Sequence, residues 1–325
     1  MNRQLVFVHG RAQQHKDASA LKAEWLDALH DGLAKNGLRL PIAESDIRFP
    51  YYGDTLYDLV DGKSADDAAA VIVRGEAGDA EEEEFTRAVM RDIQARSGID
   101  DAQLAAIAGQ DVVEKGPLNW DWFQAFLGAV DRYVPYGSGS SIALFTHDVY
   151  QYLKNSNIRD TIDTGVSAAM TRDVATVVVA HSLGTVVAYN LLRQKGHLCG
   201  WNCVLLVTLG SPLAITEIRK TVKGLAAPVR CPGCVKRWFN AMDDRDVVAL
   251  YPLDTTRFPL DPAMPGIENK RDVQNKTTNR HAGESSDLPN PNPASAPTPA
   301  PISTPFHTES RRGRPVLVAD AVAVN

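Results

Sequence analysis

One stretch, from residue 177 to residue 189, constrains the fold of this chain more than any other. Its sequence, VVVAHSLGTVVAY, starts with β-branched apolar residues that favour a buried strand and continues with apolar residues at helical spacing. Ser182 lies between the two patterns, two residues after Ala180 and two before Gly184. A serine at a sharp turn between a strand and a helix needs small residues at these two positions, because larger side chains would not fit around the strained backbone. The stretch therefore predicts a nucleophile elbow with Ser182 at its apex.

On these residues the chain resembles the serine hydrolases of the α/β-hydrolase fold. The segment Ala-His-Ser-Leu-Gly, which includes His181, is most similar to the lipase-like branch of that superfamily. The resemblance implies an α/β fold with a doubly wound, mostly parallel sheet, and catalysis through Ser182. The alternative for this stretch is a serine that caps an ordinary helix after a buried strand.

Length and composition allow a substantial core and argue against several classes of protein. The 325 residues, 44% of them apolar, can form one large α/β domain or two smaller ones. A net charge of −6 argues against nucleic acid as a partner, because phosphate binding needs a basic face. No segment approaches the ~20 apolar residues of a membrane span, and the apolar start is too short for a signal peptide. We expect a cytoplasmic protein without an integral membrane span; the oligomeric state stays open.

The first apolar strand is predicted at Leu5–Val8 and ends in His9 and Gly10. The resemblance implies that such a strand lies beside the nucleophile strand, and that the loop after it supplies one N–H group of an oxyanion hole. The two donors would then be the backbone N–H groups of Arg11 and Leu183, directed at the oxygen on which negative charge develops. The alternative is an ordinary glycine turn at the end of a strand.

Two further elements are predicted before a long interruption of the strand pattern. Apolar residues at helical spacing predict a helix over Ala18–Asn36, with its apolar face in the core, and Ser45–Tyr52 resembles a second strand. The segment that follows is too long for a single crossover, and we interpret residues 55–173, approximately, as a helical cap insertion. Its aromatic residues would either contact substrate or pack the insertion onto the sheet.

Two short features of this insertion are open to more than one interpretation. Residues 137–140, Gly-Ser-Gly-Ser, are expected to be flexible. His147 and Asp148 resemble a catalytic pair, but they are adjacent in a predicted helix over Ala143–Leu153, where neighbouring side chains point in different directions.

The acid of a catalytic triad is expected after a strand predicted at Lys236–Ala241. This strand and the loop after it resemble a lipase-like pattern, Trp-x-Asn followed by Asp-x-Val. The acid holds the histidine in the right tautomer and stabilises the imidazolium that forms. The resemblance assigns this role to Asp246, with Asp243 as the second candidate. The remaining aspartates would be turn residues.

The histidine should follow the acid, which leaves His281 and His307. His281 belongs to an Asn-x-His segment of a kind familiar in lipase-like members, and it is the predicted base. The residues after it depart from the family, in which a helix supports the histidine loop. Their proline, asparagine and alanine content cannot bury enough apolar surface to fold. We therefore expect an α/β-hydrolase domain at residues 1–283 and a disordered tail at residues 284–325.

The four cysteines offer a competing constellation. Cys231 and Cys234 form a Cys-x-x-Cys motif that could hold zinc together with Cys199 and Cys203. The earlier pair, however, is separated by three residues, and Cys203 begins an apolar strand. We expect reduced thiols, no metal site and no cofactor.

These features predict a serine carboxyl-ester hydrolase that acts on a small-molecule or lipid ester through an acyl-enzyme on Ser182. The acyl chain length and the leaving group stay open. The same residues would make an acyltransferase if an alcohol replaced water. From a different class, a catalytically impaired hydrolase could act as a binding or interaction module, which the altered tail favours.

Overall fold

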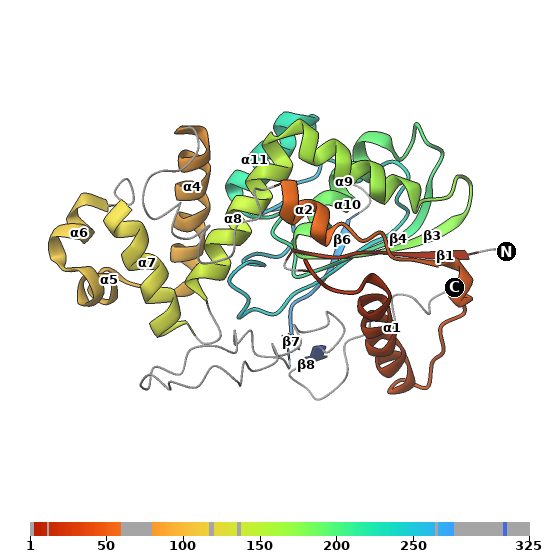
Figure 1. Ribbon diagram of the computed structural model, residues 1–325, viewed down its shortest axis with the longest axis horizontal. Helices are drawn as coiled ribbons and strands as arrows, with labels where there is room; N and C mark the ends of the chain where they lie inside the picture. Colours follow the sequence, from red (N-terminus) through yellow and green to blue (C-terminus); the bar gives the residue numbers. More distant parts are fainter. Residues whose placement is uncertain are drawn as a thin grey trace.

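The computed structural model describes residues 3–11, 13–59, 80–116, 120–134, 138–263, 266–275 and 308–310. In this part of the chain, six strands form one parallel sheet in the order β2-β1-β3-β4-β5-β6 (Figure 1). The strands are β1 (Arg3–Val8), β2 (Ile47–Arg48), β3 (Ala175–His181), β4 (Asn202–Leu209), β5 (Trp238–Ala241) and β6 (Ile267–Lys270). The predicted α/β class and the parallel sheet are confirmed.

The central strands β1 and β3 are apolar on both faces because both faces are covered. Leu5 and Phe7 point into one buried cluster, whereas Val6 and Val8 point into the other. Strands buried in this way have continuous apolar sequences rather than alternating ones. Their pairing runs from Arg3 opposite Ala175 to Val8 opposite Ala180.

Helices cover the sheet on both sides. Helix α1 (Ala18–Ala34) covers one face, and its predicted apolar stripe is buried there. The other face is covered by α8 (Gly139–Lys154), α9 (Ser156–Ala168), α10 (Leu183–Lys195) and α11 (Thr216–Leu225). The crossover from β1 through α1 to β2 gives a parallel pair.

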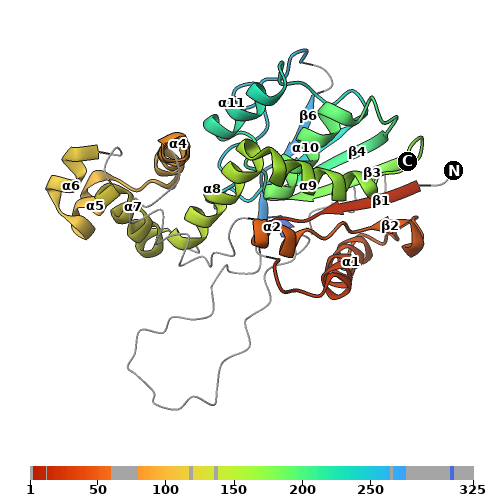
Figure 2. The same ribbon diagram turned by 45° about the horizontal axis from the view of Figure 1, so that its top comes forward.

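The described part of the chain between β2 and β3 is helical. Besides α8 and α9 it contains α2 (Gly53–Leu59), α4 (Ala80–Ser97), α5 (Asp101–Ala108), α6 (Gln110–Lys115) and α7 (Trp120–Tyr133). Figures 1 and 2 show α4 to α7 beyond the carboxyl ends of the strands. Trp122, Phe123 and Phe126 of α7 are buried, and the rings of Trp122 and Phe126 stack with centroids 5.4 Å apart. In this structure these aromatic side chains therefore pack the insertion.

Two elements differ from the sequence-based expectation. Strand β2 is shorter than the predicted Ser45–Tyr52, because a 3-10 helix, η1 (Glu44–Asp46), precedes it and Pro50, which has no N–H to donate, follows closely. In the predicted tail, β8 (Thr308–Ser310) pairs antiparallel with β7 (Val273–Asn275). The other residues of 284–325 lie outside the described ranges. Among the helices that the structure describes, none combines the length and apolar character needed to cross a membrane.

Candidate active site

Ser182 connects β3 to α10 in a backbone conformation that is unusual for a side-chain-bearing residue. Its φ of 52° and ψ of −126° lie where a non-glycine residue is strained. Hydrogen bonds hold this conformation: the Ser182 N–H donates to the Leu209 carbonyl (3.0 Å), and the Ser182 carbonyl accepts from the Thr185 N–H (2.9 Å). Within the described ranges, the Ser182 hydroxyl makes no hydrogen bond and the side chain is partly exposed. The backbone is fixed while the hydroxyl is left available.

Gly184 allows α10 to begin directly against the end of β1. A Cβ atom at this position would lie 2.3 Å from the carbonyl oxygen of Val8 and 2.4 Å from that of His9. Ala180, the small residue on the other side of the turn, is fully buried. Close packing therefore explains why both residues beside the predicted elbow are small.

Two buried hydroxyl groups fix the elbow from the neighbouring loop. Thr185 Oγ1 donates to the Ser182 carbonyl at 2.7 Å. Because that proton is used, Ser211 Oγ donates to Thr185 Oγ1, at 2.9 Å. Ser211 Oγ in turn accepts from the Leu213 N–H at 3.4 Å. Ser211 thus supports the turn on which Ser182 is displayed.

Gly10 brings the end of β1 against the serine. A Cβ atom on Gly10 would lie 3.0 Å from Ser182 Cβ, a distance too short for most side chains. The resemblance expects this strand beside the nucleophile strand, and β1 indeed pairs with β3. The strand order reverses between β1 and β3, and ligands of open α/β sheets bind in the crevice at such a switch point.

Both ring nitrogens of His9, the residue before Gly10, make hydrogen bonds to the backbone. Nδ1 donates to the Gly10 carbonyl (2.7 Å), and Nε2 accepts from the Tyr52 N–H (3.0 Å). This pattern requires the neutral ring, and burial lowers the pKa of His9 to about 4. The Tyr52 ring stacks on the imidazole with centroids 4.0 Å apart, and its hydroxyl donates to the His9 carbonyl. His9 is a structural support of the loop.

The loop after β1 has its carbonyl groups engaged by side chains. The Arg11 carbonyl accepts from Gln13 Nε2 (3.0 Å), and the Gln13 carbonyl accepts from the Tyr51 hydroxyl (2.5 Å). The N–H groups of Arg11 and Leu183 donate no hydrogen bond to any residue that the structure describes. Leu183 is the first residue of α10, where N–H groups lack partners within the helix. Within the described residues, two N–H groups without an acceptor therefore follow Gly10 and Ser182 directly in the chain.

Asp246 lies in the loop after β5, near the carboxyl end of β4. Its Oδ1 accepts from the N–H groups of Val248 (2.8 Å) and Ala249 (3.2 Å). Its Oδ2 would lie 3.4 Å from a Cβ atom on Gly210, and His181 Nε2 would lie 3.6 Å from the same point. Burial raises the pKa of Asp246, an effect that the two N–H groups oppose and nearby Asp243 reinforces. Burial lowers the pKa of His181 to about 4, so its ring is neutral at pH 7.

Asp243, the second candidate acid, has a different environment. It is buried, and both of its carboxylate oxygens contact Arg245: Nε lies 2.9 Å from Oδ1 and Nη2 lies 2.6 Å from Oδ2. This bidentate pair is a strong structural arrangement. The two aspartates therefore differ: Asp243 is held by Arg245, whereas Asp246 Oδ2 lies close to Gly210.

The side chains of the Trp-x-Asn segment, Trp238 and Asn240, take part in a hydrogen-bond network between neighbouring strands. Trp238 Nε1 donates to Thr208 Oγ1 (3.0 Å), which donates to Asn240 Oδ1 (2.8 Å). Asn240 Nδ2 donates to Asn269 Oδ1 (2.9 Å), which also accepts from the Leu253 N–H (2.9 Å). This network joins β4, β5 and β6 and holds the far end of the loop that carries Asp246.

The predicted base, His281, lies outside the described residues, as does His307. The structure therefore brings Ser182, Gly10, His181 and Asp246 to the carboxyl ends of neighbouring strands. It does not place the histidine that would complete a triad.

Cys203, Cys231 and Cys234 lie near one another at the amino end of β4. All four cysteines are free thiols. Burial raises the pKa of Cys231 and of Cys234 to about 11, and it raises the pKa of Cys203 still further. Among the described residues, no group of three or more potential ligand side chains is placed to hold a metal ion.

Several supporting residues were not identified from the sequence. Tyr51 and Tyr52 follow β2, and the parallel pairing of β1 with β2 places them beside His9. The available sequence signal is their position at the end of the second predicted strand, Ser45–Tyr52. For Thr185, the sequence indicates only a position in the helix after Ser182, and no local pattern predicts its hydrogen bond to the Ser182 carbonyl.

Comparison with known proteins identified no relative: no family model, curated protein or solved structure matches this chain.

Proposed function

We propose that this chain is a serine carboxyl-ester hydrolase of the α/β-hydrolase type, with Ser182 as its nucleophile. The observation that carries the proposal is the backbone of Ser182, held at φ 52° between a buried strand and a helix. Strain of this kind persists where the surrounding structure maintains it, and it clusters at functional sites. The available N–H groups of Arg11 and Leu183 support the same interpretation, because an oxyanion hole requires donors without another acceptor.

In the proposed reaction, Ser182 Oγ attacks the carbonyl carbon of an ester while its proton passes to a histidine, which the sequence assigns to His281. The N–H groups of Arg11 and Leu183 stabilise the oxyanion of the tetrahedral intermediate. The bond to the leaving oxygen then breaks, and the departing alcohol takes the proton from the histidine. Water attacks the acyl-enzyme by the same route, which releases the carboxylic acid and restores Ser182. Asp246 would orient the histidine.

The test is labelling of the purified full-length protein with a serine-reactive fluorophosphonate, followed by peptide mapping. We expect the label on Ser182, because only an activated serine reacts readily. Ser182→Ala should not be labelled, whereas Ser97→Ala should be labelled like the wild type. Ser97 is a suitable control because its hydroxyl only donates to the Gln94 carbonyl near the end of α4.

Hydrolysis of p-nitrophenyl esters from acetate to palmitate measures the same function with substrates. Activity that disappears in Ser182→Ala would establish the ester hydrolase, and the preferred chain length would define the acyl site. A folded wild type that is neither labelled nor active on any of these esters would overturn the proposal in favour of a binding module.

A further inference from the structure

A buried ion pair connects the loop after β1 to the helical insertion. Arg11 Nε lies 2.8 Å from Asp148 Oδ2, and the two side chains are only 13% and 6% exposed. Asp148 belongs to α8 and is 137 residues away from Arg11 in the sequence. An ion pair so far out of solvent is strongly coupled, because removing one partner leaves an uncompensated buried charge.

The contact between Arg11 and Asp148 restrains the backbone of Arg11, next to the peptide group that joins it to Gly10. Arg11 is held at two points: its side chain by Asp148 and its carbonyl oxygen by Gln13 Nε2, at 3.0 Å. The N–H of Arg11 is bonded to the same Cα atom as the restrained side chain. The direction of that N–H is set by the planar peptide group between Gly10 and Arg11, whose carbonyl accepts from His9 Nδ1 at 2.7 Å. The two contacts of Arg11 restrain the Cα atom on the other side of this peptide group.

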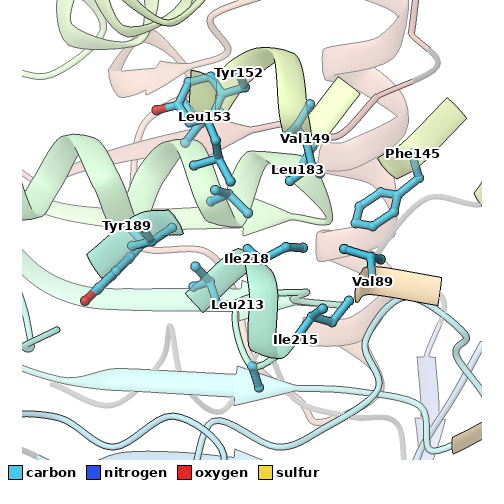
Figure 3. Close-up of a cluster of buried hydrophobic side chains, with 14 of the residues drawn as sticks. Val89, Phe145, Val149, Tyr152, Leu153, Leu183, Tyr189, Leu213, Ile215 and Ile218 are labelled. Atoms are coloured by element: carbon cyan, nitrogen blue, oxygen red, sulfur yellow. The ribbon is translucent and has the colours of Figure 1, made fainter. Parts of the chain in front are cut away.

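The same helix also belongs to the buried cluster that includes Leu183, the residue that carries the second proposed donor. Phe145 and Val149 of α8 belong to the buried cluster that surrounds Leu183 (Figure 3). On its other side, α8 is joined to α4 by His147, whose Nδ1 lies 2.6 Å from Glu82 Oε1. His147 and Asp148 thus point in different directions, as expected for adjacent helical residues, and each has its own partner.

We propose that Asp148 is a positioning residue of the oxyanion hole, which holds Arg11 so that its N–H is directed at the oxyanion site. The insertion then contributes to catalysis through α8. The inference rests on the proposed function, since it assigns a role within the same site. Preorganised donors matter because removing one donor from an oxyanion hole lowers kcat by about 10²–10³-fold.

The experiment compares the full-length wild type with Asp148→Asn, Asp148→Glu and Glu82→Gln. Asp148→Asn keeps the size of the side chain and removes its charge. Glu82→Gln makes the same chemical change in the buried carboxylate that contacts His147 of α8. The measurements are the rate of fluorophosphonate labelling, kcat and KM on a p-nitrophenyl ester, and the unfolding temperature.

We expect Asp148→Asn to lower the labelling rate and kcat about tenfold or more, with KM changed less than twofold, because displaced donors act on the transition state. Asp148→Glu, which keeps the anion, should recover most of the loss, and Glu82→Gln should stay within about twofold of the wild type. If Asp148→Asn does not fold, Arg11→Lys replaces it, and slow labelling is again the supporting result.

Three results would overturn the inference. A wild-type rate in Asp148→Asn, or in Arg11→Lys where that variant replaces it, would show that the ion pair does not position the donor. An equal loss in Glu82→Gln would show a general effect of α8 on stability. A wild type that is not labelled at all would remove the proposed function, and this inference with it; that result is distinguished from the others by the wild-type sample alone.

Discussion

Gly184 and Val8 are in closer contact than any side chain would permit. A Cβ atom on Gly184 would lie 2.3 Å from the Val8 carbonyl oxygen, so the first turn of α10 lies against the backbone of β1. This contact places the start of the helix, and with it Ser182, at the end of the neighbouring strand.

Gly184→Ala should lower the free energy of unfolding by about 1–3 kcal/mol, the usual cost of overpacking, because backbone atoms cannot move aside as a flexible side chain can. Urea denaturation measures this change. The matched control is Gly165→Ala: Gly165 is helical and exposed, with open space around its Cβ position. That substitution should stabilise the protein by about 0.5–1 kcal/mol. Equal effects of the two substitutions would contradict the close contact.

Thr185→Val should weaken the elbow without creating a cavity. The substitution removes the hydrogen bonds to the Ser182 carbonyl and to Ser211 Oγ. We expect a loss of about 1–2 kcal/mol in unfolding free energy, because buried polar groups lose their partner. Fluorophosphonate labelling of Ser182 should also slow.

The control for Thr185 is Thr161→Val on α9, where an exposed threonine donates only to the Asn157 carbonyl four residues earlier. A change within about 0.5 kcal/mol is expected there, as for most surface substitutions. If Thr185→Val behaved in the same way, the hydroxyl chain would have no structural role.

The stability of the protein should fall as the pH decreases from about 6.5 to about 4. The pKa of His9 is about 4 in the folded chain, below the 6.5 of an unfolded histidine, so the unfolded state binds more protons in this range. Stability therefore rises with pH across the window, and His9 alone accounts for about 3 kcal/mol. His181, with its pKa lowered in the same way, adds to the effect.

Urea denaturation at a series of pH values, on the wild type and on His9→Gln, tests this assignment. The variant should be less stable at pH 7, but its stability should depend less on pH between 4 and 6.5. Parallel profiles for the two proteins would mean that His9 is not the group responsible.

The cysteines should react in the order of their exposure, and zinc should leave the unfolding temperature unchanged. Cys199 is partly exposed, whereas Cys203 is buried with a strongly raised pKa. In a thiol titration, Cys199 should react first and Cys203 only after unfolding, because the thiolate is the reactive form. A rise in unfolding temperature with added zinc, reversed by a chelator, would instead indicate a metal site.

The central strands and the elbow could be predicted because short-range patterns determine them. An apolar run, a small residue, a serine and a helical repeat are all contained within residues 177–189, and each agrees with the final structure. The partner of that strand was also predicted, on the resemblance of Leu5–Val8 and His9-Gly10 to a known pattern. The turn that carries Ser182 therefore followed from local sequence, whereas the supporting contacts of Thr185, Tyr51 and Tyr52 did not.

The contacts of the insertion could not be predicted in this way, because they depend on helix positions in space. Gly139 resembled part of a flexible linker, but a Cβ atom there would lie 2.6 Å from the Leu127 carbonyl, so this glycine permits α8 to pack against α7. The pairing of Asp148 with Arg11 joins residues that no local pattern connects. Burial of the α7 aromatic residues likewise required the whole helical arrangement.

The pairing of β1 with β3 has a consequence for how the chain is made. Arg3 aligns with Ala175, so β1 is synthesised about 170 residues before the strand β3 with which it pairs. At the usual rates of about 5–20 residues per second, that interval is on the order of ten to thirty seconds on a ribosome. During this time an apolar strand has an unpaired edge, which favours aggregation. Contacts so distant in sequence also slow folding. Expression at lower temperature or with chaperones should therefore raise the soluble yield.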